Sequence, residues 1–368
     1  MKSLSALEIS YLIKELDFLI NARIDKIYVP RKKEIIIQLY ASSKGKYSVK
    51  IDEKSFYLTE YKPASETPSD FCMYLRKKLG TARLRKIHQL GFERIVSFEF
   101  ETKSAKFELI AELFSTGNII LTKNSKIIVA AEYQNWKDRT IRPNESYNHP
   151  KKDYNFLELK ITELKKLLSE TKKENIVKCL AIDLGLGGVY SEEACLLAGI
   201  DKTKKANELE ENEIKKMFSS LEELKSKKLS PLIVYKNNEI IDLVPFELKF
   251  YSNLKQEHAK TYSEILDSYF SKGVSIKQKE KHQKQIESIQ KIIDEQKQDI
   301  ERLEKEEHEN KEKAELLYKN YQLVSNILSE LKEISKKHSW KDIKDKLKDH
   351  NLIKEVTPAE KSIVIELK

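Results

Sequence analysis

The feature that most constrains the fold is a heptad pattern between residues 286 and 331, whose positions recur at alternating steps of three and four. This spacing is typical of the contact seam of a coiled coil. It predicts a helix over 276–336, which at 1.5 Å per residue would be roughly 90 Å long. The seam is polar in its middle and would pair weakly there. A solvated single helix, a parallel homodimer and an antiparallel intramolecular pair all remain open, and the oligomeric state stays unassigned. The seam positions are Ile286, Ile289, Ile293, Gln296, Ile300, Leu303, Glu307, Asn310, Ala314, Leu317, Tyr321, Val324, Leu328 and Leu331.

Positive charge is concentrated in the first 150 residues. They hold 26 basic and 18 acidic side chains, a net charge of +8, against +9 for the whole chain. Residues 71–90 contain six basic side chains and no acid, which is the pattern that a phosphate backbone attracts. The alternative is a solvated surface that keeps the protein in solution. The residues expected to contact an RNA backbone here are Arg76, Lys77, Lys78, Arg83, Arg85 and Lys86.

The first 150 residues predict an α+β domain. Residues 5–19 have helical spacing, and Ser5 with Glu8 forms a capping box at the start. A loop over 62–70 ends in Asp70 as the N-cap of a basic helix over 71–79, which Gly80 ends. The remaining segments alternate with turns but not with helices, so they indicate an antiparallel, sandwich-like sheet rather than a doubly wound fold. The strands are predicted at 23–29, 34–40, 47–51, 55–59, 86–90, 95–100, 106–113, 118–122 and 126–131.

Residues 137–155 look like a polar, extended connector, and helical spacing follows over 156–228. Residues 231–250 predict a hairpin with Asn237 and Asn238 at its turn. The last part predicts a short helix at 340–347 and a strand at 362–367. The predicted domains are therefore 1–150, a helical domain with a hairpin over 156–270, the coiled-coil helix 276–336 and a small, incomplete domain over 338–368.

Several chemistries are absent from the sequence. It contains no GxxxxGK[ST], GxSxG or HExxH pattern, and its histidines have no metal-ligand spacing. We therefore expect no cofactor, no metal and no catalytic constellation. Cys72, Cys179 and Cys195 lie far apart, which fits a reducing compartment. No signal peptide or membrane span is recognisable, so we expect a cytoplasmic protein without a membrane partner.

The sharpest local motif is DLGLGGVYSEEACLLAGID at 183–201. Gly185, Gly187 and Gly188 stand between two helical segments, as in a helix-hairpin-helix, whose turn grips nucleic-acid backbone through its N–H groups. A purely structural helix turn is the alternative. The flanks of the turn are acidic, with Asp183, Glu192 and Glu193.

This motif resembles the helix-hairpin-helix signature of the NFACT family. These are ribosome-associated quality-control factors, called NEMF in animals and RqcH in bacteria and also described as fibronectin-binding-protein-A-like. The resemblance extends over the whole chain. Its other blocks are SALEISYLIKEL (5–16), ARIDKIYVP (22–30), FCMYLRKKL (71–79), GFERIVSFEF (91–100), LIAELFSTGNIILTK (109–123), DRTIRPNESY (138–147), TYSEILDSYF (261–270), AELLYKNYQLV (314–324) and HSWKDI (338–343).

The resemblance implies an architecture and a role. The family has an NFACT-N domain similar to the N-terminal domain of the Fpg/Nei DNA glycosylases, a helix-hairpin-helix domain, a coiled coil with a middle domain at its tip, and an NFACT-R domain. The return helix and NFACT-R are not in this sequence, so we expect an N-terminal portion of such a factor. The family binds the stalled large ribosomal subunit with peptidyl-tRNA and recruits aminoacyl-tRNA, chiefly alanyl-tRNA, for template-free tailing of the nascent chain. The ribosome makes the peptide bonds, so the factor itself is not an enzyme.

The resemblance also assigns residues. An Asp-Arg pair tied to tRNA engagement in the family matches Glu93 and Arg94, and an early acid of the first helix matches Glu8. Arg94 would contact a phosphate or a base edge, and Glu93 would position it or meet a ribose hydroxyl. Arg139 and Arg142, in the DRTIRPNESY block, are further residues expected to contact RNA backbone. A quality-control partner protein is a candidate for the coiled coil.

Three other functions fit the sequence less well. A glycosylase-like DNA-binding protein would use an N-terminal Pro followed by Glu, whereas this chain begins Met1-Lys2-Ser3. A surface adhesin would need an export segment. A coiled-coil scaffold that only docks proteins would not explain the net charge of +8 in the first 150 residues.

Overall fold

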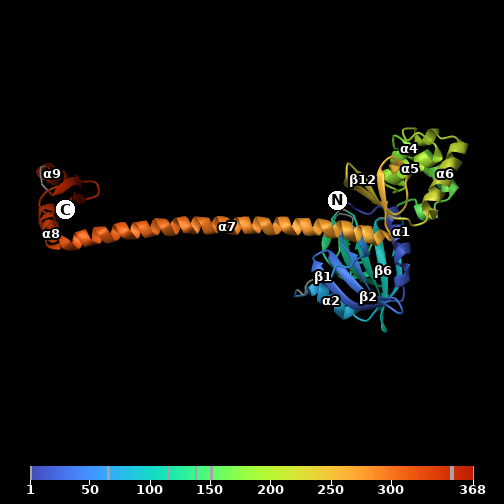
Figure 1. Ribbon diagram of the computed structural model, residues 1–368, viewed down its shortest axis with the longest axis horizontal. Coiled ribbons are helices and arrows are strands. Elements are labelled where there is room, and N and C mark those ends of the chain that lie inside the picture. Colours follow the sequence, from blue (N-terminus) through green and yellow to red (C-terminus); the bar gives the residue numbers. More distant parts are fainter. Residues whose placement is uncertain are drawn as a thin grey trace. The chain divides into compact units, whose positions relative to one another are not determined.

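The computed structural model describes residues 2–63, 67–114, 116–136, 139–149, 152–348 and 352–367, and the backbone without the side chains over 272–285. The chain divides into two compact units, Met1–Ser275 and Ile276–Lys368. We call them the body and the arm and describe each by itself (Figure 1).

A large antiparallel sheet forms the first part of the body. Its strands, in sheet order, are β4, β3, β2, β1, β5, β6, β7, β8 and β9. They are β1 (Arg23–Arg31), β2 (Glu34–Ala41), β3 (Gly45–Ile51), β4 (Phe56–Leu58), β5 (Arg83–Gln89), β6 (Ile95–Glu101), β7 (Lys106–Glu112), β8 (Asn118–Lys123) and β9 (Lys126–Ala130). All nine correspond to predicted strands, although β5 begins three residues earlier than expected.

The sheet folds into two facing halves. The strands β1 and β5 are paired at Arg23 and Arg83, where the halves meet. Phe56 of β4 lies edge-to-face on Phe98 of β6, with ring centroids 5.8 Å apart, although these strands are far apart in the sheet order. Both rings belong to one apolar cluster with residues from the two halves. The predicted α+β fold with a sandwich-like antiparallel sheet is therefore confirmed.

Two helices accompany this sheet. The helix α1 (Ala6–Leu16) has the predicted capping box of Ser5 and Glu8. It is apolar on two sides, and its residues enter both large clusters of the body. The helix α2 (Asp70–Leu79) ends at Gly80 as predicted. Its N-cap is Ser69 rather than Asp70, because the Ser69 hydroxyl accepts from Cys72 N and the Asp70 carboxylate instead lies in the positively polarised first turn.

The second part of the body is a helical lobe with a small sheet. Its helices are α3 (Ile161–Glu170), α4 (Ile176–Lys178), which continues as the π-helix η3 (Cys179–Asp183), α5 (Gly188–Ala198) and α6 (Glu211–Ser226). Its strands β12 (Leu232–Lys236), β13 (Glu239–Val244) and β14 (Lys255–His258) have the order β13, β12, β14. Asn237 and Asn238 both have positive φ, as the predicted hairpin turn requires.

The expected connector over 137–155 is more structured than its composition indicates. Strand β11 (Arg139–Ile141) pairs with β10 (Gln134–Trp136), and Ser146 bridges to Lys126. Ile141 is fully buried in a small apolar cluster of its own. The polar composition hid this packing, because in its described part the segment buries only one isoleucine and is otherwise held by polar contacts such as that of Arg139 with Glu112. Residues 137, 138, 150 and 151 of the expected connector lie outside the described residues.

The arm contains residues 276–319 of the long helix α7 (Tyr262–Lys319), then α8 (Tyr321–Ser335), α9 (Trp340–Lys346) and the hairpin β15 (Ile353–Thr357) and β16 (Ser362–Ile365). The heptad pattern runs through Asn320, but the helix is interrupted there: the side-chain amide of Asn320 donates to Leu316 O at 3.0 Å. Such a side chain competes with the helix backbone. In the described part of α7, seam residues such as Ile286, Ile300 and Leu303 are more than half exposed.

Candidate nucleic-acid interface

Glu93 and Arg94 lie in the turn between β5 and β6, where Gly91 has a φ of +62°. The side-chain amide of Gln89 donates to Glu93 O at 2.7 Å and to Ala6 O at 3.0 Å, which holds this turn against the start of α1. Arg94 Nη1 donates to Ser3 Oγ at 3.2 Å. Both charged side chains are half-buried, so they are fixed in place yet remain accessible to a partner.

Lys152 connects Glu93 to the helical lobe. Its Nζ lies 3.6 Å from Glu93 Oε1. The same ammonium group lies beside Gly185, where an added Cβ would come within 2.2 Å of it. The structure therefore brings the predicted pair and the predicted glycine turn together. Sequence reasoning missed Lys152, because nothing distinguishes it from the many other lysines of the chain.

The glycine turn, residues 184–187, leads into α5. Gly185 and Gly187 have φ values of +83° and +78°, which L side chains rarely adopt. Gly187 is the N-cap of α5 and offers no side chain to the first N–H groups of the helix, and that first turn contains no acid. Such an end attracts an anion, because the unpaired N–H groups and the helix dipole both favour negative charge.

The acids that flank the glycine turn have partners within the lobe. Asp183 accepts from Thr171 Oγ1 at 2.6 Å and lies near Lys173, and Glu192 pairs with Lys202 at 2.7 Å. Glu193 is fully buried and accepts the backbone N–H groups of residues 249 and 250. These carboxylates are held by their partners, which reduces their opposition to a phosphate at the turn.

Glu8 is buried at the junction between α1 and the helical lobe. Its carboxylate accepts from Ser5 N at 2.7 Å, from Lys2 Nζ at 2.5 Å and from Tyr190 OH at 2.9 Å. Lys2 also donates to Asp242 at 2.7 Å. Burial by itself would lower the pKa of Lys2, but the two carboxylates outweigh it and raise that pKa. Glu8 is 1% exposed, so the structure places it beneath the surface on which Arg94 lies.

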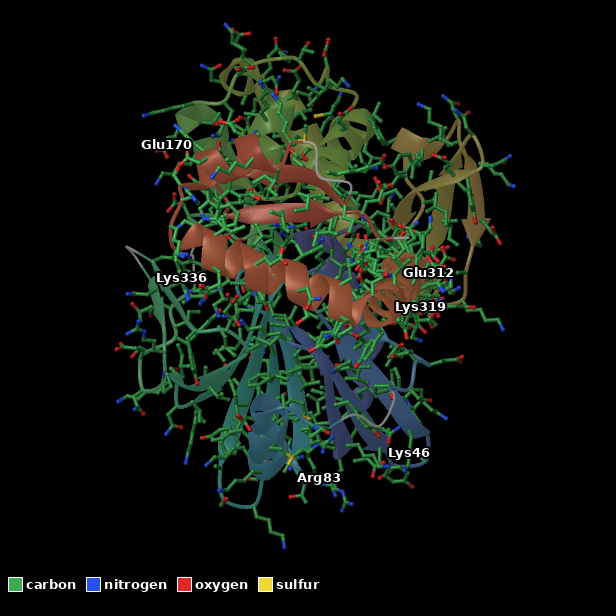
Figure 2. The ribbon with its side chains drawn as sticks, turned by 90° about the vertical axis from the view of Figure 1, so that its left-hand side faces the viewer. Lys46, Arg83, Glu170, Glu312, Lys319 and Lys336 are labelled. Atoms are coloured by element: carbon green, nitrogen blue, oxygen red, sulfur yellow. The ribbon has the colours of Figure 1, made fainter. Side chains whose placement is uncertain are left out.

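The six basic residues of 71–90 form a second group, which we call the basic strip. Arg76, Lys77 and Lys78 end α2, and Arg83, Arg85 and Lys86 lie on β5. A register shift between residues 84 and 86 turns Arg85 and Lys86 to the same, exposed side. Figure 2 shows Arg83 at the opposite end of the body from Glu170 of α3. Glu93 lies just beyond the other end of β5, so that about 20 Å of strand separate it from Arg83.

The basic strip is less positive than its sequence indicates. Arg85 pairs with Glu101 of β6 at 2.6 Å, and Lys86 lies 4.0 Å from Glu99. These acids belong to β6 and therefore lie outside residues 71–90 in the sequence. A count of charge over 71–90 does not include them, although they face the basic residues across the sheet.

Arg139 and Arg142 have different environments. Arg139 is largely buried, its guanidinium pairs with Glu112, and Tyr147 OH donates to the same carboxylate at 2.8 Å. This arrangement occupies Arg139 within the domain and anchors β11. The Arg142 side chain is exposed and has no such carboxylate partner among the described residues.

Within the described ranges, no three His, Cys, Asp or Glu side chains gather in a way that would hold a metal ion. In that same part of the chain, every helix is too short or too polar to cross a membrane.

Comparisons with known proteins place this architecture. A family model for NFACT N-terminal and middle domains matches residues 6–366. A Methanocaldococcus jannaschii protein named "Archaeal Rqc2 homolog aRqcH" is 33% identical over 396 aligned residues, covering 100% of this chain and 59% of that protein. The human "Ribosome quality control complex subunit NEMF" is 23% identical, covering 93% of this chain and 35% of its own length. The chain therefore spans about three fifths or less of these relatives.

Solved structures agree on the fold. The N-terminal part of a fibronectin/fibrinogen-binding protein from Streptococcus suis has a TM-score of 0.59 at 23% identity, covering 73% of this chain and 100% of that one. A fibrinogen-binding protein from Staphylococcus aureus has a TM-score of 0.60 at 18% identity, covering 72% and 98%. Because the family model matches nearly the whole sequence and the archaeal relative aligns along all of it, this chain belongs to the NFACT family.

Proposed function

We propose that this chain acts in ribosome-associated quality control. In this role it binds the stalled large ribosomal subunit with its peptidyl-tRNA and recruits aminoacyl-tRNA, chiefly alanyl-tRNA, for template-free tailing of the nascent chain. Family membership and the printed names of the relatives support the quality-control role. In this proposal the chain works in the cytoplasm as a binder, and the ribosome carries out the chemistry.

The observation that carries the proposal is that Lys152 joins Glu93, the neighbour of Arg94 in the sequence, to the glycine turn. An RNA backbone can be bound there by two cationic side chains and by the open N-terminus of α5. Arg94 has a planar donor fork that suits a phosphate or the edge of a base. Glu93, held by Lys152, is available to a ribose 2′-hydroxyl, which distinguishes RNA from DNA.

Glu8 has a positioning role in this proposal. It fixes α1 against Tyr190 of α5, and the start of α1 in turn supports the turn that carries Arg94. The basic strip would add salt-dependent affinity for RNA some distance away, most strongly through Lys77 and Arg76, which have no acid partner in the described part of the body. Arg139 supports the fold, while Arg142 remains available to RNA.

The exposed seam of α7 suits a partner helix, and we include a quality-control protein as its candidate. The glycosylase-like alternative gains nothing from the structure. Its reactive amine would have to stand near residue 2, where the Lys2 ammonium is held between Glu8 and Asp242.

Ultraviolet crosslinking of the full chain to RNA in cell extract, followed by sequencing, tests the proposal. We expect tRNA and large-subunit rRNA to dominate, and Arg94→Ala to reduce the tRNA share while rRNA persists. Arg302→Ala, at an exposed arginine of α7, serves as the matched control. Recovery no better than that of an unrelated basic protein would refute the proposal for this chain.

A further inference from the structure

A groove runs along the part of β1 beyond Arg23, where this strand no longer pairs with β5. Residues of α2 and residues 61, 63, 67 and 68 line its other sides. Two adjoining hollows share Tyr28, Pro63 and Arg76 as lining residues. The larger hollow has a volume of about 640 Å³ and extends to Ile24 and Gly80. This volume lies within the range of small-ligand sites, roughly 300–1,000 Å³. The smaller hollow continues past Tyr61.

The lining of the groove combines aromatic faces with cations. The guanidinium carbon of Arg76 lies 6.0 Å from the centre of the Tyr28 ring. Lys26 lines the same hollow, and Tyr61 is 44% exposed. Asp25, an acid of the lining, is neutralised by Lys46 at 2.8 Å. A cationic groove with accessible aromatic rings suits an anionic chain whose units stack.

Tyr61 is held in place from α7. Its N–H donates to Thr59 Oγ1 at 3.1 Å, and that hydroxyl donates to Asp267 Oδ1 at 2.6 Å. The N–H of Glu60 donates to the other oxygen of Asp267 at 3.1 Å. The backbone that carries the ring is therefore fixed before any ligand arrives, which lowers the entropic cost of binding.

The edge of β1 is blocked against an added strand. Ile27 O already accepts from Arg76 Nε at 2.8 Å, and Cys72 Sγ lies 3.6 Å from it. Pro30 has no N–H to donate. A peptide that pairs with a sheet edge needs these backbone groups. A single nucleic-acid strand needs only the ring faces and the cations.

We propose that this groove binds a single-stranded RNA segment, with bases on Tyr61 and Tyr28 and phosphates towards Arg76 and Lys26. The inference rests on the proposed RNA-binding function, but it concerns a surface other than that of Arg94, and it shares Arg76 with the basic strip. Ile24 and Gly80 flank the Arg23–Arg83 pair at the start of β5, whereas Arg94 follows the end of that strand.

Fluorescence anisotropy tests the proposal with the full chain and a labelled, unstructured oligouridylate. The oligonucleotide has about ten nucleotides, a length within the range of known single-strand site sizes. Stacking on one aromatic side chain is worth about 5- to 150-fold in affinity. We expect Tyr61→Ala to weaken binding by at least about fivefold, and a duplex of equal length to bind more weakly than the single strand. Tyr40→Ala is the matched control, since Tyr40 is 49% exposed on β2 and does not line the groove.

Equal oligonucleotide affinity of Tyr61→Ala and Tyr40→Ala would overturn the proposal. The proposal would also be overturned if an acidic peptide of similar length displaced the oligonucleotide and if the affinity of that peptide fell in Tyr61→Ala. The groove would then be a peptide site. Arg94→Ala, measured with the oligonucleotide and with tRNA, separates the two proposals. If tRNA binding proves independent of Arg94 while oligonucleotide binding depends on Tyr61, the groove stands and the tRNA site fails.

Discussion

Lys152 Nζ lies 3.6 Å from Glu93 Oε1 and at the same time fills the space beside Gly185 that a methyl group would need. One lysine thus joins the turn after β5 to the glycine turn before α5, two segments that are about 90 residues apart in the sequence. A side chain at Gly185 would displace the Lys152 ammonium group, and the φ of +83° at this position favours glycine. The contact of Lys152 also brings the two segments together into the surface that we propose as the RNA site.

The two neighbouring glycines of the motif provide a matched test of backbone conformation. Gly187 and Gly188 both have open space where a Cβ would be, but Gly187 has a φ of +78° and Gly188 is helical. We expect Gly187→Ala to lower the free energy of unfolding by about 1–2 kcal/mol through backbone strain. Gly188→Ala should change it by no more than about 1 kcal/mol, since alanine favours the helix. Urea titrations of both variants would decide, and equal effects would count against the positive φ assigned to Gly187.

The buried Arg139–Glu112 pair predicts a folding defect rather than an RNA-binding defect. Glu112 is 2% exposed, so Arg139→Ala would leave an unpaired buried carboxylate and lower the free energy of unfolding by about 3–5 kcal/mol. Arg142→Ala, at an exposed side chain nearby, should leave stability within about 0.5 kcal/mol of wild type. Thermal unfolding of the two variants measures the difference. An Arg139→Ala variant of wild-type stability would show that the pair is not buried in solution.

The basic strip predicts a specific salt dependence. Lys77 has no acid partner in the described part of the body, so Lys77→Ala should reduce the slope of log affinity against log salt by about one unit. Glu101 neutralises Arg85, and Glu101→Gln should therefore strengthen RNA binding without changing the fold. Filter binding of tRNA at several salt concentrations measures both. Unchanged slopes would mean that the basic strip does not touch RNA.

His88 predicts a loss of stability towards acid. Burial, with a contribution from the nearby Lys86, lowers its pKa below the ordinary 6.5, although Glu99 and Glu108 act in the opposite direction. The unfolded chain then takes up the proton more readily than the folded one, so stability falls as pH drops through 6.5 towards the lower folded pKa. Urea unfolding at about pH 7.5 and about pH 5.5 should show a larger loss for wild type than for His88→Asn. Equal losses would contradict this assignment.

Much of the fold could be predicted from local signals. The nine strands of the large sheet, the capping box at Ser5 and the Asn237–Asn238 turn all follow from short-range patterns, and the structure confirms them. What local pattern could not show is which acid neutralises which base. Glu101 lies across the sheet from Arg85, and Glu112 reaches Arg139 from 27 positions away in the sequence.

The candidate site was predictable in its residue types but not in its assembly. The glycine spacing marks the turn and a family resemblance marks Arg94, but neither can show that Lys152 joins Glu93 to the turn or that Glu8 is buried against Tyr190. Tyr61 carried no sequence signal at all, since its role depends on Asp267 of α7, more than 200 residues later. The break at Asn320 was also invisible, because the heptad spacing continues across it.

The central claim is tested most directly by the affinity of the full chain for purified tRNA. Arg94→Ala and Arg302→Ala are measured side by side with the wild type. Loss of a charged hydrogen bond to RNA is worth about 1.5–3 kcal/mol, so Arg94→Ala should weaken binding by roughly 10- to 150-fold. Arg302→Ala should bind as wild type does. If Arg94→Ala binds tRNA as tightly as Arg302→Ala, the surface formed by Arg94, Lys152 and the glycine turn is not a tRNA site.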